Sequence, residues 1–358
     1  MTLSFRHIED TNPLSSADGL AGDEALVSGL ADGNSPPTLR LYRYHPSAIV
    51  GRYQNLTDAI NLDTCRRYGV SWNRRHTGGG TVLMGPEQVA IALALPDGRD
   101  SERRTIKQHF EFFAAILADA LGAFGIEAAF VGKNDLQVDG RKIAGLAISQ
   151  DTDGAVFYHG SLLLDFDVGL MVQVLNLPTE HLEDRGQSCF SRRMTTVREH
   201  VPGASFPDLT AAIARSLESL THVQLCRSSF LDHEHEAIAR LKRERYENEE
   251  WICSSRVMRR WRGMVERKTA AGTIRIYVDG SGPALDAVLI TGDYFSRNLE
   301  LATLESNLKG TPARSDAIAS VISKCGQGTI YRLTAEELAE LIVMARQSNT
   351  TARLTSQA

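Results

Sequence analysis

The sequence predicts an α+β protein: a mixed, antiparallel-rich sheet core with packed helices, followed by a small α+β C-terminal domain. Three observations support this. The chain has 358 residues, which suits two domains. Its apolar stretches alternate between strand-like and helix-like spacing. Its composition becomes polar and highly charged after position 230. With 42% hydrophobic residues, the chain has enough apolar side chains for a large core, which excludes disorder for most of it.

The first domain is expected to combine short strands with one long amphipathic helix. That helix is predicted over residues 105–124, where apolar side chains recur every three or four positions and Gly125 follows as a stop. Pro96 ends the most apolar predicted strand. The other predicted elements are strands at 39–50, 70–75, 89–95, 128–131, 136–138, 142–150 and 155–164, and helices at 58–68, 168–175 and 207–220.

Three regions follow from the composition along the chain. Residues 1–230 are expected to form the large domain, 231–250 a charged linker region, and 251–358 the C-terminal domain with a frayed tail. The C-terminal elements are predicted to be strands at 264–268, 273–278 and 287–291, and helices at 301–308, 315–323 and 334–345, with Thr334 as the N-cap of the last helix.

Charge and cysteine content narrow the class of protein. The chain carries 39 Lys and Arg against 44 Asp and Glu, a net charge of −5, which argues against a dedicated nucleic-acid binder. Five widely spaced cysteines without a Cys-x-x-Cys pair argue against a disulfide framework and favour the reducing cytoplasm. No signal peptide and no run of 18 apolar residues is recognisable, so a cytoplasmic protein that does not span a membrane is expected.

The most informative stretch is Arg-Arg-His-Thr-Gly-Gly-Gly at residues 74–80. Consecutive glycines allow unusual backbone dihedrals and let N–H groups approach an anion closely. The paired arginines supply charge-assisted donors for phosphate or carboxylate. A flexible turn after a strand is the plain structural alternative.

Two further stretches contain side chains suited to acyl or phosphate chemistry. Residues 132–145 place an Asp-Gly turn before Arg141 and Lys142 at the start of a returning strand. A lysine there is a compact charge suited to neutralising phosphate and carboxylate oxygens, although this stretch taken alone favours a solvated hairpin tip. His159 and Gly160 precede an apolar run, and a lone histidine beside a glycine is commonly structural.

Taken in order, these stretches resemble the lipoate-protein ligase family, within the superfamily of biotin and lipoate protein ligases. The family pattern is Arg-Arg-x-Ser/Thr-Gly-Gly-Gly-x-Val, then Asn-Asp and Arg-Lys-hydrophobic-Ser/Ala-Gly, then His-Gly-Ser/Thr-Leu-Leu. Residues 51–55 match its Gly-Arg-x-Gln-Asn, and Asp293 resembles the Gly-Asp-Phe-type turn of its C-terminal accessory domain. The resemblance spans residues 15 to 325.

The resemblance implies an ATP-dependent ligase with Mg²⁺. It would activate lipoate, or octanoate, as acyl-AMP and transfer the acyl group to a lysine of a lipoyl carrier protein. That carrier would be H-protein-like or a dehydrogenase E2 lipoyl domain; no nucleic-acid or membrane partner is implied. Lys142 would be the catalytic lysine, and Asp135 would contact the metal. The substrate- and adenylate-binding residues would be Arg74, Arg75, Thr77, Gly78, Gly79, Gly80, Asn134, Asp135, Gly145, His159 and Gly160.

One departure from the family pattern leaves alternatives open. Met84 and Gly85 replace the usual His-Asp, and Gln88 replaces the usual Asn. An ATP-independent octanoyltransferase would instead use a cysteine thioester, with Cys189 as the candidate nucleophile. A non-catalytic lipoyl-carrier binding protein is the other alternative, against which the presence of Lys142 argues. The expected extra C-terminal domain argues against the transferase.

A local basic surplus suggests a carrier-docking surface. Residues 240–268 contain ten Lys and Arg against five Asp and Glu. Such a surface would attract an acidic lipoyl domain, and Arg256, Arg259 and Arg260 are its candidate contacts. A solvated charged helix followed by a strand is the structural alternative.

Overall fold

The structure is a computed structural model that describes residues 4–97, 104–150, 154–176, 192–254, 261–296, 298–325 and 329–348. The chain divides into two compact units. The first comprises Met1–Val50, Thr57–His76 and Thr81–Ile252, and the second comprises Gly51–Leu56, Thr77–Gly80 and Cys253–Ala358. Two short segments of the N-terminal half therefore group with the C-terminal residues, which a single cut in the sequence does not predict.

The first unit contains a large mixed sheet. Eight strands of the described chain form it in the order β11-β1-β2-β6-β10-β9-β8-β7. β1 pairs in parallel with β11 and β2, and the remaining pairs are antiparallel. The strands are β1 (Ser4–Glu9), β2 (Thr38–Tyr42), β6 (Gln88–Pro96), β7 (Ala129–Val131), β8 (Asp135–Val138), β9 (Arg141–Ser149), β10 (Ala155–Leu163) and β11 (Gln224–Arg227). This arrangement confirms the predicted α+β class.

A second, smaller sheet carries the start of the arginine motif. It consists of β4 (Ser71–Arg74), β3 (Ser47–Val50) and β5 (Val82–Met84), in that order. The predicted strand 39–50 is wrong in one respect, because β2 and β3 lie in different sheets. The chain leaves the large sheet after Tyr42 and enters the small one at Ser47, so one apolar stretch serves two sheets.

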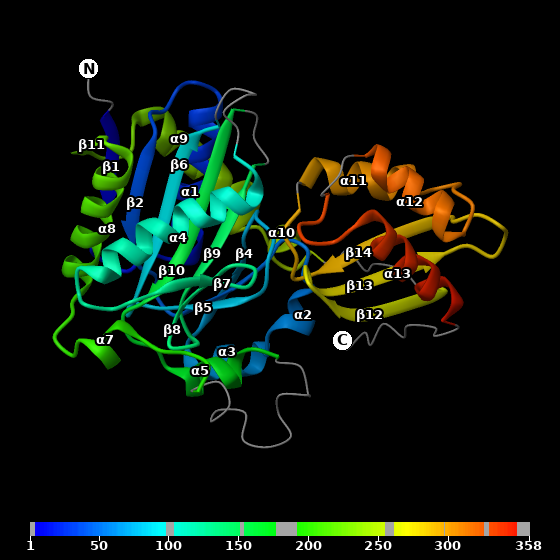
Figure 1. The fold of residues 1–358 in the computed structure, drawn as a ribbon, viewed down its shortest axis with the longest axis horizontal. Helices are drawn as coiled ribbons and strands as arrows, with labels where there is room; N and C mark the ends of the chain where they lie inside the picture. Colours follow the sequence, from blue (N-terminus) through cyan, green and yellow to red (C-terminus); the bar gives the residue numbers. More distant parts are fainter. Residues whose placement is uncertain are drawn as a thin grey trace. The chain divides into compact units, whose positions relative to one another are not determined.

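Helices cover both faces of the large sheet (Figure 1). Side-chain size along β6 alternates between the faces: Ala90, Ala92 and Ala94 pack in one cluster with α1 (Ser16–Ala31) and α9 (Asp232–Leu241). The opposite face packs against the predicted long helix, α4 (Ile106–Gly122), whose N-cap is Thr105. The other helices of this unit are α2 (Leu56–Ala59, whose first residue groups with the second unit), α3 (Leu62–Tyr68), α5 (Val168–Val174), α7 (Val197–His200), α8 (Phe206–Thr221) and α10 (Glu249–Ile252).

Helix α1 escapes sequence analysis for a physical reason. Most of its residues between Ser16 and Val27 are buried, including the charged Asp23 and Glu24. A helix buried on most of its circumference lacks the polar face that gives an amphipathic pattern. Its start is marked only by Ser15, whose side chain accepts a hydrogen bond from the amide of Asp18.

Residues 231–250, predicted to be a charged linker region, belong to the first unit instead. They form α9, a π-helical turn η2 (Lys242–Tyr246) and the start of α10, and all of them group with the first unit. Their apolar side chains explain the difference, because Leu241 and Tyr246 are buried in the same cluster as α1. The many charged side chains of this segment lie mainly on its exposed side, whereas a few apolar side chains pack it against the core.

The second unit is a three-stranded antiparallel sheet with helices. Its sheet order is β12-β13-β14, and its core contains side chains from every one of these strands and from the three helices. The elements are β12 (Gly263–Thr269), β13 (Gly272–Asp279), β14 (Ala287–Gly292), α11 (Asn298–Asn307), α12 (Ser315–Lys324) and α13 (Ala335–Gln347). In the described part of the chain, none of the helices is both long and apolar enough to cross a membrane.

Candidate functional site

The β8–β9 hairpin brings Lys142 and Asp135 together. Its turn uses Asp139 and Gly140, both with positive φ, at 50° and 74°. Lys142 Nζ lies 2.7 Å from Asp135 Oδ1, and each side chain is one-third exposed. The backbone of Lys142 also bonds to residues 193–195: its amide donates to the carbonyl oxygen of Arg193, and its carbonyl oxygen accepts from the amide of Thr195. An accessible ion pair is thus fixed on a strand rather than on a loose hairpin tip.

Glycines beside Lys142 make room for its ammonium group. A Cβ at Gly145 would lie 3.1 Å from Lys142 Nζ. Gly160 has a different neighbourhood, because a Cβ there would lie 2.8 Å from the carbonyl oxygen of Gly145 and 3.2 Å from the ring of Phe113. Gly160 therefore permits the close packing of β10 on β9 and α4, whereas Gly145 shapes the surroundings of the lysine.

Asn134 ties the hairpin together. Its side-chain amide donates to the carbonyl oxygen of Leu146 at 2.9 Å, and its own carbonyl oxygen accepts from the amide of Leu146 at 2.8 Å. Asn134, Asp135, Lys142 and Gly145 are accordingly brought together as the motif spacing predicts. The structure gives Asn134 a structural hydrogen bond in this group.

The two arginines of the motif have different surroundings. Arg74 ends β4 and is almost fully buried; its Nε donates to the carbonyl oxygens of Trp251 and Ile252 at 3.1 and 3.2 Å. Arg75 is also buried, and its Nη1 donates to the carbonyl oxygen of Ile49 at 3.2 Å. Burial lowers the pKa of Arg75 to about 10. A buried cation of this kind is stabilised by an anion, so Arg75 is the better candidate for binding one.

His159 lies in the electrostatic neighbourhood of Arg75 and His76. Burial lowers its pKa well below the ordinary value, and the charges of Arg75 and His76 lower it further. The imidazole is therefore neutral at pH 7. Its ring stacks on Phe157 at 5.0 Å between centroids, and Phe157 in turn stacks on His76 at 5.8 Å. His159 thus belongs to a packed aromatic row beside the buried arginine.

Thr77 to Gly80 group with the second unit. Within that unit the amide of Gly79 donates to the carbonyl oxygen of Tyr294 at 2.8 Å, and Gly79 has a φ of 92°. A Cβ at Gly78 would lie 2.4 Å from the same Tyr294 oxygen, and one at Gly80 would meet the side chain of Asp293 at 3.6 Å. Gly78 is needed because the Tyr294 carbonyl oxygen approaches it closely, and Gly79 because of its positive φ, whereas the contact at Gly80 is an ordinary one. The Gly79 amide already has an acceptor.

Several candidates behave differently from expectation or lie outside the described residues. Cys189 and the arginines 256, 259 and 260 are outside the described ranges. Within the described part of the basic stretch, four cations form ion pairs, which weakens the docking hypothesis: Arg240 with Glu244, Lys242 with Asp18 and Glu247, Arg245 with Glu24, and Arg262 with Asp279.

Gln88, at the usual Asn position, is buried and donates to the carbonyl oxygen of Leu83.

Two side chains that no sequence motif marks bond to the arginine motif. The hydroxyl of Tyr246 lies 3.2 Å from His76 Nδ1, and Trp251 Nε1 donates to the carbonyl oxygen of Arg74 at 2.9 Å. Both residues lie in the charged segment, more than 160 positions from the motif. The only local signal is a tyrosine and a tryptophan in an otherwise polar stretch.

Comparisons with protein families identify the class of this fold. Residues 15–218 match the lipoyl protein ligase A/B catalytic domain, and residues 264–342 match the bacterial lipoate protein ligase C-terminus. The chain belongs to the lipoyl protein ligase A/B family of enzymes, whose members include lipoate ligases and octanoyltransferases. The resemblance predicted from the motifs is thereby confirmed.

Individual relatives carry both kinds of name. The chain is 27% identical over 266 residues to octanoyltransferase LipM of Brevibacillus brevis, covering 67% of this chain and 96% of that protein. It is 27% identical over 311 residues to a lipoate–protein ligase of Streptococcus pyogenes, covering 84% of this chain and 88% of that protein. The ligase alignment is thus the longer of the two on this chain.

Solved structures match the fold. P. falciparum LipL1 in complex with lipoate superposes with a TM-score of 0.74 at 16% identity, covering 95% of this chain and 99% of that one. Lipoate-protein ligase A bound with ATP gives 0.61 at 23%, covering 70% and 98%. A bipartite lipoate protein ligase of Thermoplasma acidophilum, described with its E2 lipoyl domain, gives 0.62 at 24%, covering 71% and 96%. The predicted lipoate-ligase type of sheet core is confirmed.

Proposed function

We propose that the protein is an ATP-dependent lipoate-protein ligase. The match of residues 264–342 to the bacterial lipoate protein ligase C-terminus is the observation that carries this choice. The LipM relative aligns with only 67% of the chain, whereas the ligase aligns with 84%. A C-terminal unit of ligase type favours the ligase over the transferase.

In the first step, a carboxylate oxygen of lipoate attacks the α-phosphorus of ATP. An oxygen–phosphorus bond forms, the bond from the α-phosphorus to the bridging oxygen breaks, and pyrophosphate leaves. Arg75 would bind the carboxylate, since a buried guanidinium is a charge-assisted donor. Lys142 would neutralise charge that develops on the phosphate oxygens, because its ammonium group is accessible and fixed on β9.

In the second step, the amine of a carrier lysine attacks the carbonyl carbon of lipoyl-AMP. A carbon–nitrogen bond forms, the carbon–oxygen bond to the phosphate breaks, AMP leaves, and the nitrogen loses a proton to solvent. Lys142 would again face the departing phosphate. His159 would serve as a neutral wall of the acyl site, in keeping with its lowered pKa and its stacking on Phe157.

Asp135 is the candidate contact for Mg²⁺. Among the described residues, no group of three or more His, Cys, Asp or Glu side chains gathers to hold a metal ion. One carboxylate together with substrate phosphates is nevertheless a common way for proteins to hold Mg²⁺, so Asp135 fits a nucleotide-bound ion. When bound, the ion supplies positive charge that offsets the charge of the phosphates.

The proposed partner is a lipoyl carrier protein, either H-protein-like or a dehydrogenase E2 lipoyl domain. The structural neighbour from T. acidophilum, described with its E2 lipoyl domain, supports this class of partner. The composition supports the cytoplasm as the compartment, since the five cysteines show no paired motif.

Octanoyl transfer is the second candidate, because several relatives are named octanoyltransferase LipM. In that reaction Cys189 would take the acyl group as a thioester and pass it to the carrier lysine without ATP. Lipoate-dependent exchange of labelled pyrophosphate into ATP separates the two reactions, because it requires reversible adenylation. Exchange that depends on lipoate supports the ligase. Octanoyl transfer from a thioester donor, without exchange, would overturn the ligase proposal.

A further inference from the structure

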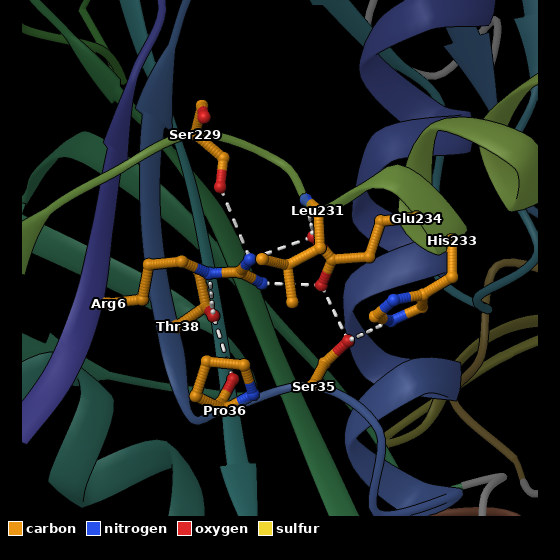
Figure 2. Close-up of polar contacts among 8 residues, drawn as sticks. All are labelled: Arg6, Ser35, Pro36, Thr38, Ser229, Leu231, His233 and Glu234. Atoms are coloured by element: carbon orange, nitrogen blue, oxygen red, sulfur yellow. Dashed lines mark hydrogen bonds and ion pairs between the residues drawn. The ribbon is translucent and has the colours of Figure 1, made fainter.

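Residues 231–252, here called the strap, are attached to the first unit at three places. The first attachment lies at the start of α9, where the carboxylate of Glu234 is fully buried. Both of its oxygens accept from Arg6, at 2.6 and 2.8 Å, and Ser35 donates to it at 2.5 Å (Figure 2). This bidentate pair fixes the first turn of the strap to β1.

The second attachment lies at the π-helical turn η2. Lys242 Nζ lies 2.7 Å from Asp18 Oδ1, and Arg245 forms an ion pair with Glu24. Tyr246, fully buried, donates its hydroxyl to Glu24 Oε2 at 2.5 Å. Burial raises the pKa of Glu24, but the charges and hydrogen bonds of His76, Tyr246 and Arg245 outweigh it, so the pKa is lowered.

The same turn reaches the arginine motif. The carbonyl oxygen of Tyr246 accepts from Asn73 Nδ2 at 2.9 Å, while its hydroxyl lies 3.2 Å from His76 Nδ1. Tyr246 therefore bonds to the motif on both sides of Arg74: its backbone carbonyl bonds to Asn73, and its hydroxyl contacts His76. π-Helical turns are rare and occur frequently at functional sites, which agrees with a turn that aims one tyrosine at two targets.

The third attachment lies at α10 and is reciprocal. Trp251 donates its indole N–H to the carbonyl oxygen of Arg74 at 2.9 Å. In return, Nε of Arg74 donates to the carbonyl oxygens of Trp251 and Ile252. The guanidinium of Arg245 lies over the Trp251 ring, 5.0 Å from its centroid. The buried guanidinium of Arg74 thus holds the last turn of the strap by hydrogen bonds to its carbonyl oxygens.

Arg75, the next residue of the motif, is bonded to strand β3. Its amide donates to the carbonyl oxygen of Val50 at 3.0 Å and its Nη1 to that of Ile49 at 3.2 Å, both on β3. The backbone on either side of Arg75 is thereby held by the strap through Asn73, Arg74 and His76. Any shift of the strap at Tyr246 or Trp251 would move the backbone that presents Arg75.

We propose that Tyr246 and Trp251 are positioning residues for Arg75, and that Arg74 anchors the strap instead of binding substrate. This inference rests on the proposed function, which gives Arg75 the lipoate carboxylate as its ligand. It assigns a role to a segment that no sequence motif marks. It also gives the two adjacent arginines different roles: Arg74 holds the strap in place, and Arg75 binds the lipoate carboxylate.

The experiment compares Tyr246→Phe and Trp251→Phe with Ser35→Ala in the full-length protein. Both aromatic variants keep an aromatic ring. Tyr246→Phe removes the contact of the hydroxyl with His76 together with its hydrogen bond to Glu24, and Trp251→Phe removes the hydrogen bond to the carbonyl oxygen of Arg74. The control removes a hydrogen bond from the far end of the strap, at Glu234. Lipoate affinity is measured by calorimetry, and kcat and KM for lipoate and for ATP by carrier lipoylation. Thermal unfolding reports the stability lost in each variant.

Each aromatic variant should weaken lipoate binding and raise the lipoate KM by about threefold to tenfold, the effect of losing one hydrogen bond to the arginine motif, with the ATP KM unchanged. Ser35→Ala should lower the unfolding temperature without changing lipoate affinity. Equal kinetic changes in all three variants, or none in the aromatic pair, would overturn the inference. If the unaltered protein binds lipoate but shows no pyrophosphate exchange, the proposed ligase reaction is wrong. The lipoate affinities of the three variants relative to the unaltered protein would still test the role of the strap. Absence of lipoate binding by the unaltered protein would overturn both proposals.

Discussion

The Lys142 hairpin and the Arg74–His76 segment supply the two sets of charges of the candidate site, and they are held in opposite ways. Lys142 reaches Asp135, its partner, seven positions away in the same hairpin. Arg74 and His76 bond to Trp251 and Tyr246, about 170 positions further along the chain. One region is organised by its own turn, whereas the other depends on a distant segment folding onto it.

This difference has a consequence for how each region responds to change. A hairpin residue that is one-third exposed contributes little to stability, so its removal should affect chemistry and leave the fold intact. The arginine segment is buried and shares its hydrogen bonds with the strap. Changes there should couple stability and ligand binding.

The largest effect is expected from Lys142→Ala. It should lower carrier lipoylation by about 10²-fold or more, the usual loss when one charge-stabilising group is removed. Thermal unfolding should change little, because partly exposed ion pairs are worth about 0–1 kcal/mol. Lys107→Ala is the matched control, since Lys107 pairs with Glu111 on the exposed side of α4. Near wild-type lipoylation by Lys142→Ala would remove the proposed role.

The contrast between these regions also explains what the sequence could predict. The hairpin was predictable from its Asp-Gly turn, which pairs β8 with β9 and so brings Asp135 and Lys142 close together. The register shift between Leu136 and Gln137, which sets Asp135 opposite Gly145, was not predictable from the turn. Helix α4 was predictable from its apolar spacing and its Thr105 cap. These features depend on residues close together in the sequence.

The missed features depend on distant contacts. The strap reads as a charged linker because its two anchoring aromatics, Tyr246 and Trp251, are outnumbered by charged side chains. The grouping of Thr77–Gly80 with the second unit depends on Tyr294, more than 200 positions away. The motif predicted a glycine loop whose amides bind an anion. Nothing in the loop itself predicts that the Gly79 amide donates to the carbonyl oxygen of Tyr294.

A medium effect is expected from Arg75→Lys. Lysine keeps the positive charge but lacks the planar fork that donates to the Ile49 carbonyl oxygen and to a carboxylate at once. The lipoate KM should rise by about tenfold, with a smaller change in kcat. The control is Arg66→Lys, because Arg66 is exposed and pairs with Asp63 on α3. An unchanged lipoate KM would contradict the assignment of Arg75 to the carboxylate.

The pH dependence of unfolding tests the buried side of the comparison. Burial holds the pKa of His159 below its ordinary value of 6.5, so below that pH the unfolded chain takes up a proton that the folded chain refuses. The free energy of unfolding should therefore fall as pH drops below 6.5. His159→Gln should lose less stability between pH 7.5 and 5.5 in urea titrations, whereas His235→Gln, at an exposed position, should behave as the wild type does. His7 and His109, whose pKa values burial also lowers, should retain their share of the loss in this variant, so an identical loss in His159→Gln would show that the His159 imidazole does not contribute.

The smallest effect is expected from Cys189→Ser, and it decides between the two reactions. A ligase needs no cysteine, because ATP supplies the activation of the carboxylate, so lipoylation with lipoate and ATP should stay within about twofold of wild type. A thioester transferase would lose nearly all activity, since the hydroxyl of serine is a far weaker nucleophile than a thiol at neutral pH. The measurement runs both reactions on the same preparation, lipoate with ATP and octanoyl thioester without it, with Cys226→Ser, an exposed cysteine on β11, as the control. Loss of ATP-dependent lipoylation in Cys189→Ser, with Cys226→Ser unaffected, would place a cysteine in the reaction path and contradict a ligase reaction that relies on Lys142 at the phosphate and Arg75 at the carboxylate.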